Sequence, residues 1–278
     1  MDLVEKFEIV GATDTGMKRQ HNEDSIGTEL EMGLVVLADG MGGYKAGEVA
    51  SALAVNTVIS ELSEHLEMIA KGDIAIIDGE RGYSMESLAL EEVIKKSNSI
   101  IHTTQKHNEE CKGMGTTIVS ALFYDNRISI AHVGDSRLYR LRNDQLEQIS
   151  KDHTLLQELV DRGFYTPEEA RTSLNKNLVT RALGVDAEVE VDIQEDIALP
   201  QDIYLLCSDG LNDMIEDKDI YLTIKEFSDN LHKAAQELVK RANESGGKDN
   251  ISVILVRPLK PFPAKQGWMN KVSNWFFN

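Results

Sequence analysis

Carboxylates stand at the ends of apolar runs in this sequence, where a loop can present them at the rim of a sheet. The run at 34–38 is followed by Asp39-Gly40, and the run at 203–207 is followed after one serine by Asp209-Gly210. A single Asp-Gly pair is an ordinary turn dipeptide, but its repetition after two apolar runs indicates a shared purpose. Further acidic residues border other apolar runs: Glu23, Asp24, Asp135 and Asp249.

These carboxylates would converge on one edge if their strands lie in one sheet system. Carboxylates brought together repel one another, so the arrangement is stable only if they are protonated or bound to cations. Oxygen ligands favour the hard ions Mg²⁺, Mn²⁺ and Ca²⁺. The alternative is that each aspartate forms a separate turn. That interpretation is the better one for any single aspartate, but the metal site is the better one for the set.

Arg19 precedes Asp24 closely in the sequence and suggests what the metal site would act on. Its planar guanidinium can hold a phosphate in bidentate fashion. Two adjacent divalent ions can bridge a water, lower its pKa and aim it at an electrophile, while the arginine and the ions neutralise phosphoryl oxygens. The combination predicts hydrolysis of a phosphate ester without a covalent intermediate. Without the acidic cluster, Arg19 would be interpreted as a surface residue in a loop.

Other hydrolase chemistries lack their motifs. Neither Cys111 nor Cys207 is followed by an arginine at the spacing of a cysteine phosphatase. The chain also lacks a P-loop, a zincin HExxH motif and a serine in a GxSxG context. Metal-assisted chemistry is what remains.

Composition narrows the partners and the compartment. A net charge of −18 over 278 residues argues against nucleic acid and anionic membrane as main partners, since both need a basic face. Two cysteines are too few for a disulfide framework. The N-terminus has no apolar h-region, and no apolar run approaches the ~20 residues of a membrane span. We therefore expect no membrane span and a cytoplasmic location.

The carboxylates need a sheet system to position them, and the sequence predicts one. Helical spacing predicts helices at 45–70, 85–110, 152–171 and 229–243. Within 152–171, Thr166-Pro167-Glu168-Glu169 is the capped start of a second short helix. Strands are predicted at 7–16, 34–38, 188–199, 203–207 and 251–256, with a meander of antiparallel strands over 113–150 that turns at 125–126 and 143–144. This inventory predicts an α+β layered domain with two mostly antiparallel sheets and helices on the outer faces. The chain has no linker rich in proline, glycine or serine, so we expect one domain.

The end of the chain has its own pattern. Trp268, Val272, Trp275 and Phe276 fall on one face of a helix. We expect such a helix to dock on its own domain, and docking of a partner or a membrane is the alternative.

In order, these motifs resemble the PP2C-like (PPM) metal-dependent serine/threonine protein phosphatases of bacterial type. The resemblance runs from about residue 8 to 256. It is carried by Arg19 with Asn22-Glu23-Asp24, Ala38-Asp39-Gly40-Met41-Gly42-Gly43, Gly115-Thr116-Thr117, Val133-Gly134-Asp135-Ser136-Arg137, Asp152-His153, Ser208-Asp209-Gly210 and Asp249-Asn250.

The resemblance implies a four-layer α-β-β-α sandwich formed by residues 1–258. A flap at about 152–184 would stand beside the site, and 259–278 would form an aromatic tail outside the resemblance. The implied activity is hydrolysis of phosphoserine and phosphothreonine in proteins, reversing serine/threonine kinase signalling. The implied partners are phosphorylated proteins. Two alternatives stay open: a non-catalytic scaffold of the same fold that binds phosphoproteins, and a hydrolase of small phosphate esters.

The resemblance also implies ligands for two Mn²⁺ or Mg²⁺ ions and a possible third. Asp39 would bridge the two ions, Asp209 and Asp249 would complete the shell of one, and the Gly40 carbonyl would bind the other. Asp135 would bind the third ion.

Further residues would support this site. Asp24, with Glu23 as a second candidate, would hold metal-bound waters, and Arg19 would bind the substrate phosphate. Asn250, beside Asp249, is a supporting candidate.

One departure from the family concerns the leaving group. Members commonly carry a histidine within or just after the Asp-Gly motif, where this chain has Met41 and Tyr44. The proton for the leaving oxygen could come from a metal-bound water, from Tyr44 or from His153. Because it lies in an Asp-His-Thr sequence, His153 could instead hold the flap in place.

Overall fold

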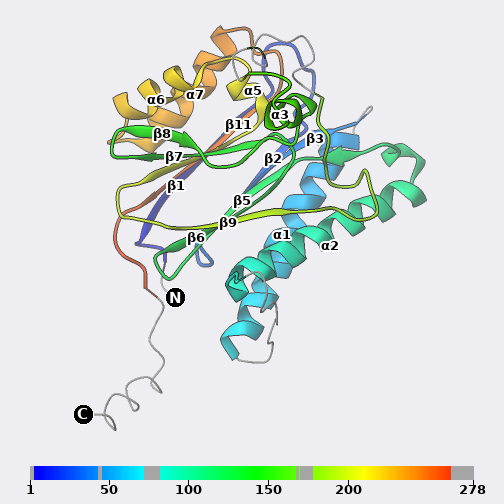
Figure 1. The fold of residues 1–278 in the computed structure, drawn as a ribbon, viewed down its shortest axis with the longest axis horizontal. Coiled ribbons are helices and arrows are strands. Elements are labelled where there is room, and N and C mark those ends of the chain that lie inside the picture. The colour runs from blue at the N-terminus through cyan, green and yellow to red at the C-terminus, as the bar shows by residue number, and fades with distance from the viewer. Residues whose placement is uncertain (1–2, 43–45, 72–81, 167–168, 170–177, 264–278) are drawn as a thin grey trace.

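A computed structural model describes residues 3–42, 46–71, 82–166, 169 and 178–263 (Figure 1). Two sheets are stacked face to face, and helices cover both outer faces. This is the four-layer α+β sandwich that the sequence predicts. Among the described residues, no helix is both long enough and apolar enough to cross a membrane.

The strands of both sheets pair antiparallel with their neighbours. The first sheet has the order β1 (Phe7–Asp14), β11 (Ile251–Pro258), β10 (Ile203–Cys207), β7 (Arg137–Arg142) and β8 (Gln145–Gln148). The second has the order β2 (Asp24–Glu29), β3 (Leu34–Met41), β5 (Ile118–Tyr124), β6 (Arg127–Val133) and β9 (Asp192–Ile197), and the short β4 (Gly115–Thr116) also pairs with β3.

Each outer face is closed by its own helices. The second sheet is covered by α1 (Ala46–Lys71) and α2 (Met85–His107), and the first by α5 (Asp209–Asn212), α6 (Asp217–Glu226) and α7 (Leu231–Glu244). A 3-10 turn, η1 (Glu109–Cys111), follows α2, and α3 (Leu155–Asp161) follows β8. Apolar side chains form three buried layers, one beneath each helix group and one between the sheets, as expected when sheets bury both faces.

The hairpin turns predicted from sequence are confirmed. Asp125 and Asn126 join β5 to β6 with φ of 44° and 57°, and Asn143 and Asp144 join β7 to β8 with φ of 50° and 61°. Two successive positive φ values are the geometry of a tight two-residue hairpin, which Asn and Asp tolerate better than most residues.

The single meander predicted over 113–150 is wrong. Strands β5 and β6 belong to the second sheet, whereas β7 and β8 belong to the first. The chain crosses between the sheets at Gly134, whose φ is 108°. A Cβ at Gly134 would lie 2.7 Å from the side chain of Thr117, so glycine is required at this crossing.

The helix predictions are correct in place and differ in extent. The first helix predicted within 152–171 is α3, which stops at Asp161, and Gly163 follows with a φ of 74°. The second, predicted to start at Thr166, lies mostly outside the described residues. Helix α6 is absent from the prediction. It buries Ile220, Thr223 and Ile224, a stripe too short to stand out as a helical period in the sequence.

The sandwich core extends past β11. Phe262 is buried and its ring centroid lies 4.8 Å from that of Phe7 and 6.4 Å from that of Phe123, between the two sheets. The division of the chain at residue 258 stays a prediction. The predicted helix from Trp268 to Phe276 lies outside the described residues, and so does most of 166–177 within the predicted flap.

Candidate metal centre

The predicted carboxylates come from both sheets and meet at one end of the sandwich. Asp24 and Asp39 are direct partners across the β2–β3 ladder. Asp209 is the first residue of α5, separated from β10 by Ser208, and Asp249 lies two residues before the start of β11. The Ser208 hydroxyl donates to Asp24 Oδ2 over 2.9 Å and so joins the end of β10 to the start of β2.

Charge repulsion shows that these groups share one environment. Burial raises the pKa of Asp39 well above its usual range, and the neighbouring carboxylates raise it further: Asp24, Asp209, Asp135 and Asp249. Burial also raises the pKa of Asp209 well above its usual range, with Asp135 and Asp249 as the next causes. The site therefore holds more negative charge than the protein itself neutralises.

Two further carboxyl groups are shifted in the same direction. Burial raises the pKa of Asp24 to about 6, although hydrogen bonds from Ser252 and Ser208 oppose the shift. Burial and then the charge of Asp152 raise the pKa of Asp135 to about 6.

Unsatisfied oxygens indicate what the cluster is built to bind. Asp24 Oδ1 and Asp209 Oδ1 are both buried, and neither has a hydrogen-bond partner among the described residues. A buried carboxylate oxygen without a partner is costly unless a ligand satisfies it. Together with the repulsion and the all-oxygen donor set, this arrangement fits hard divalent cations.

The main chain around Asp39 is held by the Gly115-Thr116-Thr117 motif. Thr117 N donates to Asp39 O over 2.9 Å, and Asp39 N donates to Thr117 Oγ1 over 3.0 Å. The Thr116 hydroxyl also donates to Asp39 O, over 2.8 Å. Thr117 Oγ1 lies 2.7 Å from the hydroxyl of Ser136, next to Asp135. The two threonines therefore orient Asp39 and link it to the turn that carries Asp135.

Gly40 and Glu23 lie beside Asp39 and Asp24 in the same ladder. The Gly40 N–H donates to Glu23 O over 3.1 Å, which closes the start of β2 onto the end of β3. Burial is the main cause that raises the pKa of Glu23.

Arg19 lies at the open side of the cluster. Its side chain is 51% exposed, and its Nη2 donates to Asp249 Oδ2 over 2.6 Å. That hydrogen bond is the first cause that raises the pKa of Arg19. The guanidinium therefore places a positive charge against the acidic cluster while half of the side chain faces solvent.

Two residues of the sequence motifs, Arg137 and Asp152, hold the fold together through an ion pair. Arg137 Nε and Nη2 donate to the carboxylate of Asp152 over 2.7–3.0 Å, and Arg137 Nη1 donates to the Tyr139 hydroxyl over 2.9 Å. These contacts pin the strand after the sheet crossing to the segment before α3.

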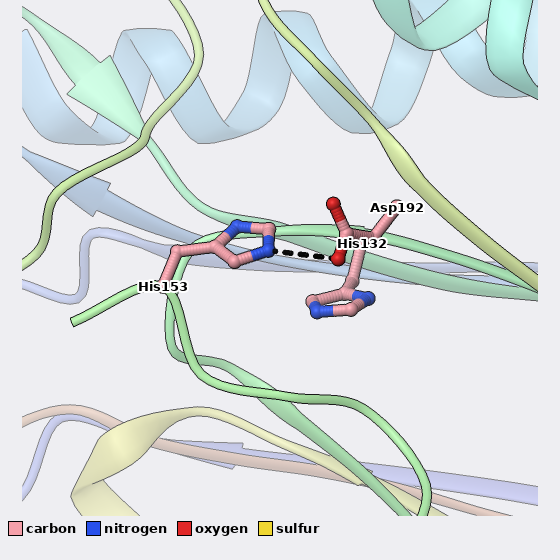
Figure 2. A group of neighbouring side chains, drawn as sticks. All are labelled: His132, His153 and Asp192. Carbon is pink, nitrogen blue, oxygen red and sulfur yellow. Dashed lines mark ion pairs between the residues drawn. The ribbon is translucent and has the colours of Figure 1, made fainter. Parts of the chain in front are cut away.

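His153 lies in a separate group with His132 and Asp192 (Figure 2). The two imidazole rings are stacked with their centroids 4.7 Å apart. His153 Nε2 lies 3.3 Å from Asp192 Oδ2, and Arg181 Nη1 donates to Asp192 Oδ1 over 2.6 Å.

This group has the residue types of a metal site, but its hydrogen bonds argue against one. The Gly134 N–H donates to His153 Nδ1 over 3.1 Å, so the neutral ring carries its proton on Nε2, where a metal would have to bind. The guanidinium of Arg181 already forms an ion pair with the carboxylate of Asp192 and would repel a metal cation. We interpret His153 as an uncharged bridge between the Gly134 turn and β9.

The charge state of His153 follows from its surroundings. Burial, and then the neighbouring His132 and Arg181, lower the pKa of His153 to about 4. The ring is therefore neutral at pH 7 and is a poor source of a proton. Its ring contacts join the Gly134 turn to Asp192 on β9, and the bracing of the flap stays a prediction. Tyr44, the other side-chain candidate, lies outside the described residues.

Sequence reasoning missed the residues that hold the site without touching a ligand. His132 and Asp192 carry no spacing that marks them, because each contacts a partner distant in sequence. Ser136 had one signal, its place in the motif around Asp135. Asn250 had one signal, its position beside Asp249.

Comparisons with known proteins agree with this geometry. Residues 16–253 match the protein phosphatase 2C family. The serine/threonine phosphatase Stp of Listeria innocua serovar 6a is 36% identical over 247 residues, which cover 88% of this chain and 93% of Stp. The crystal structure of the Mycobacterium tuberculosis serine/threonine phosphatase PstP/Ppp superposes with a TM-score of 0.79 at 36% identity, covering 92% of this chain and 100% of that one.

A structure of the PstP catalytic domain in complex with two manganese ions superposes with a TM-score of 0.74, also at 36% identity, and covers 92% of this chain and 99% of that one. The family match spans most of the chain, and the two solved structures share its fold over 92% of it. The chain belongs to the protein phosphatase 2C family.

Proposed function

We propose that the carboxylate cluster is the catalytic metal centre of this serine/threonine protein phosphatase. The observation that carries the proposal is the set of mutually repelling carboxylates around Asp39, with partnerless buried oxygens on Asp24 and Asp209. Such a set is unfavourable by itself and becomes favourable around cations. Because every predicted carboxylate of the cluster is present, the scaffold alternative has no observation in its favour.

The cofactor is Mn²⁺ or Mg²⁺, in keeping with the two manganese ions bound by the PstP catalytic domain. When bound, such ions lower the pKa of a water between them and neutralise the phosphoryl oxygens. In our proposal Asp39, Asp209, Asp249 and the Gly40 carbonyl hold two ions, and Asp135 holds a third. Asp24, with Glu23 beside it, orients water at the edge of the cluster.

Arg19 would bind the phosphate of the substrate. Its guanidinium lies against Asp249 and is half exposed, so it can present two parallel N–H donors to a phosphate entering from solvent. A dianionic phosphate needs this positive charge because the protein carries a net charge of −18.

The leaving oxygen of serine or threonine must gain a proton, and His153 is not its source in our proposal. The ring is neutral at pH 7, its Nδ1 accepts from Gly134, and its Nε2 faces Asp192. His153 instead holds the turn that carries Asp135.

The enzyme acts on phosphoproteins. We propose that it reverses serine/threonine kinase signalling in the cytoplasm, and its two free cysteines fit a reducing compartment. Docking of a partner through the aromatic tail stays a prediction.

The proposal is tested by phosphate release from a phosphothreonine peptide, with Mn²⁺ and then with EDTA. We expect wild-type turnover that needs Mn²⁺, and a loss of about a hundredfold or more in kcat for Asp209→Asn, because one metal shell is broken. Asp217→Asn is the matched control, since Asp217 lies on the same outer layer and accepts from the Tyr139 hydroxyl outside the cluster.

Turnover that survives EDTA, or an Asp209→Asn protein as active as wild type, would overturn the metal mechanism. Binding of the phosphopeptide without release of phosphate by folded, Mn²⁺-loaded wild type would establish the scaffold instead.

A further inference from the structure

Asn250 makes three side-chain hydrogen bonds to the backbone of one loop. The residue is 4% exposed and follows Asp249 directly. Its Oδ1 accepts from Glu23 N over 2.8 Å, and its Nδ2 donates to Thr15 O and His21 O, each over 2.9 Å. Both donors of the amide and its oxygen are thus engaged by the connection between β1 and β2.

That connection carries Arg19, and the bonds from Asn250 lie on both sides of it. The same loop is held further at its start, where Met17 N donates to Gly247 O over 2.7 Å. Gly16 has a φ of 79°, and a Cβ there would lie 2.1 Å from Asp249 O, so the loop lies directly on the turn that carries Asp249 and Asn250.

An exposed arginine binds a phosphate at a defined position only if the backbone that carries it is anchored. The side chain of Arg19 has many rotamers, and ordering it costs entropy each time a phosphate binds. Anchoring its backbone to the turn of Asp249 sets where the guanidinium stands relative to the metal centre.

We propose that Asn250 is the positioning residue for Arg19: its amide fixes the 15–23 loop so that the guanidinium meets a phosphate at the metal centre. The inference rests on the proposed function of Arg19 and adds a second residue to phosphate binding. Asn250 acts through the loop and is not itself a ligand, since its side-chain atoms are taken by the backbone.

The test compares Asn250→Ala, Arg19→Ala and the double variant. We expect Asn250→Ala to raise KM for the phosphopeptide about tenfold or more, with a smaller effect on kcat, because a misplaced guanidinium weakens phosphate binding. We expect the double variant to resemble Arg19→Ala alone, since a loop that no longer carries the guanidinium gains nothing from its anchor. Mn²⁺ affinity, measured by calorimetry, stays close to wild type.

Asn98→Ala is the matched control. Asn98 is 1% exposed and likewise spends its amide on three backbone groups, accepting from Gly184 N and donating to Asp186 O and Ala187 O. Its substitution removes the same number of buried hydrogen bonds from another loop. We expect a similar loss of thermal stability and a KM close to wild type.

Hydrogen–deuterium exchange separates the inference from the proposed function, because it needs no turnover. We expect faster exchange across residues 15–23 in Asn250→Ala and not in Asn98→Ala. Unchanged exchange there, full additivity in the double variant, or a matching loss of Mn²⁺ affinity would each overturn the inference. If wild type releases no phosphate while the exchange result holds, the proposed function fails and the anchoring of the loop stands.

Discussion

At the scale of single residues, the site depends on groups whose ordinary chemistry is altered by what surrounds them. Asp39 is a carboxyl group kept among other carboxyl groups, which raises its pKa. His153 is an imidazole kept neutral by burial and by the charge of Arg181, which lowers its pKa. The first arrangement attracts cations, and the second keeps a cation out.

The buried, neutral state of His153 predicts a pH dependence of stability. The unfolded chain binds a proton on this residue below about 6.5, whereas the folded protein does so only below about 4. The unfolding free energy therefore decreases as the pH falls from 6.5 towards 4. This group contributes at most about 1.4 kcal/mol per pH unit to the decrease. Above pH 7 the residue contributes no pH dependence.

Urea unfolding of wild type and His153→Asn at pH 7, 6 and 5 measures this effect. The asparagine Oδ1 can still accept from Gly134 but has no proton to gain, so the stability of wild type should fall relative to the variant on acidification. The carboxylates distant from residue 153 titrate alike in both proteins and cancel in the difference, whereas Asp192, whose pKa burial would raise but Arg181 and His153 lower, does not cancel fully. Parallel pH curves for the two proteins would show that His153 is protonated equally in both states.

At the scale of elements, the β6–β7 crossing determines how the two sheets share the site. The chain leaves the second sheet at Val133 and enters the first at Arg137, and Asp135 lies between. Gly134 makes the crossing possible by its φ of 108° and by its approach to Thr117, the residue that orients Asp39. One turn thus sets the distance between two of the proposed ligands.

We therefore expect Gly134→Ala to lower the unfolding free energy by more than backbone strain alone would. Its Cβ would lie 2.7 Å from Thr117, and we expect a loss of about 2–4 kcal/mol in unfolding free energy. Gly163→Ala is the control, because Gly163 has a φ of 74° with nothing within 4 Å of its Cβ, and should cost about 1 kcal/mol. Equal losses in urea unfolding would mean that the contact with Thr117 does not matter.

At the scale of the whole molecule, the proposed metal centre joins both sheets, so we expect ion binding and folding to be linked. Asp24 and Asp39 belong to the second sheet, whereas Asp209 and Asp249 adjoin strands of the first. Without cations, the repulsion among them opposes the packing of one sheet on the other. Ions bound between them would stabilise the folded state by mass action.

We expect Mn²⁺ at about 100 times its Kd to raise the unfolding free energy by about 2.7 kcal/mol per site. Asp39→Asn should remove most of this gain, because it takes away the proposed bridging ligand. In EDTA the same variant should be more stable than wild type, by on the order of 1 kcal/mol, since one repelling charge is gone. Melting curves of both proteins with Mn²⁺ and with EDTA give the comparison. A variant that is less stable than wild type in EDTA would contradict the role of repulsion.

The sequence by itself determined the features that depend on neighbours along the chain. Runs of apolar residues placed Asp209 just after a strand, and Asn or Asp pairs placed the two tight turns, because burial and turn geometry are local preferences. The same pattern was wrong in ending the strand before Asp39, since β3 continues to Met41 and carries Asp39 within its ladder. The ordered motifs added the family, its layered fold and its cluster of carboxylates.

Only the tertiary structure decided which sheet each strand joins and which side chains hold the site. Periodicity along 113–150 cannot show that the chain changes sheets at Gly134, since a strand has the same pattern in either sheet. Asn250 reaches Glu23 across 227 positions of sequence, and His153 reaches Asp192 through a fold that brings β9 beside β6. Contacts of this kind depend on how the layers pack, and no local pattern of residues encodes them.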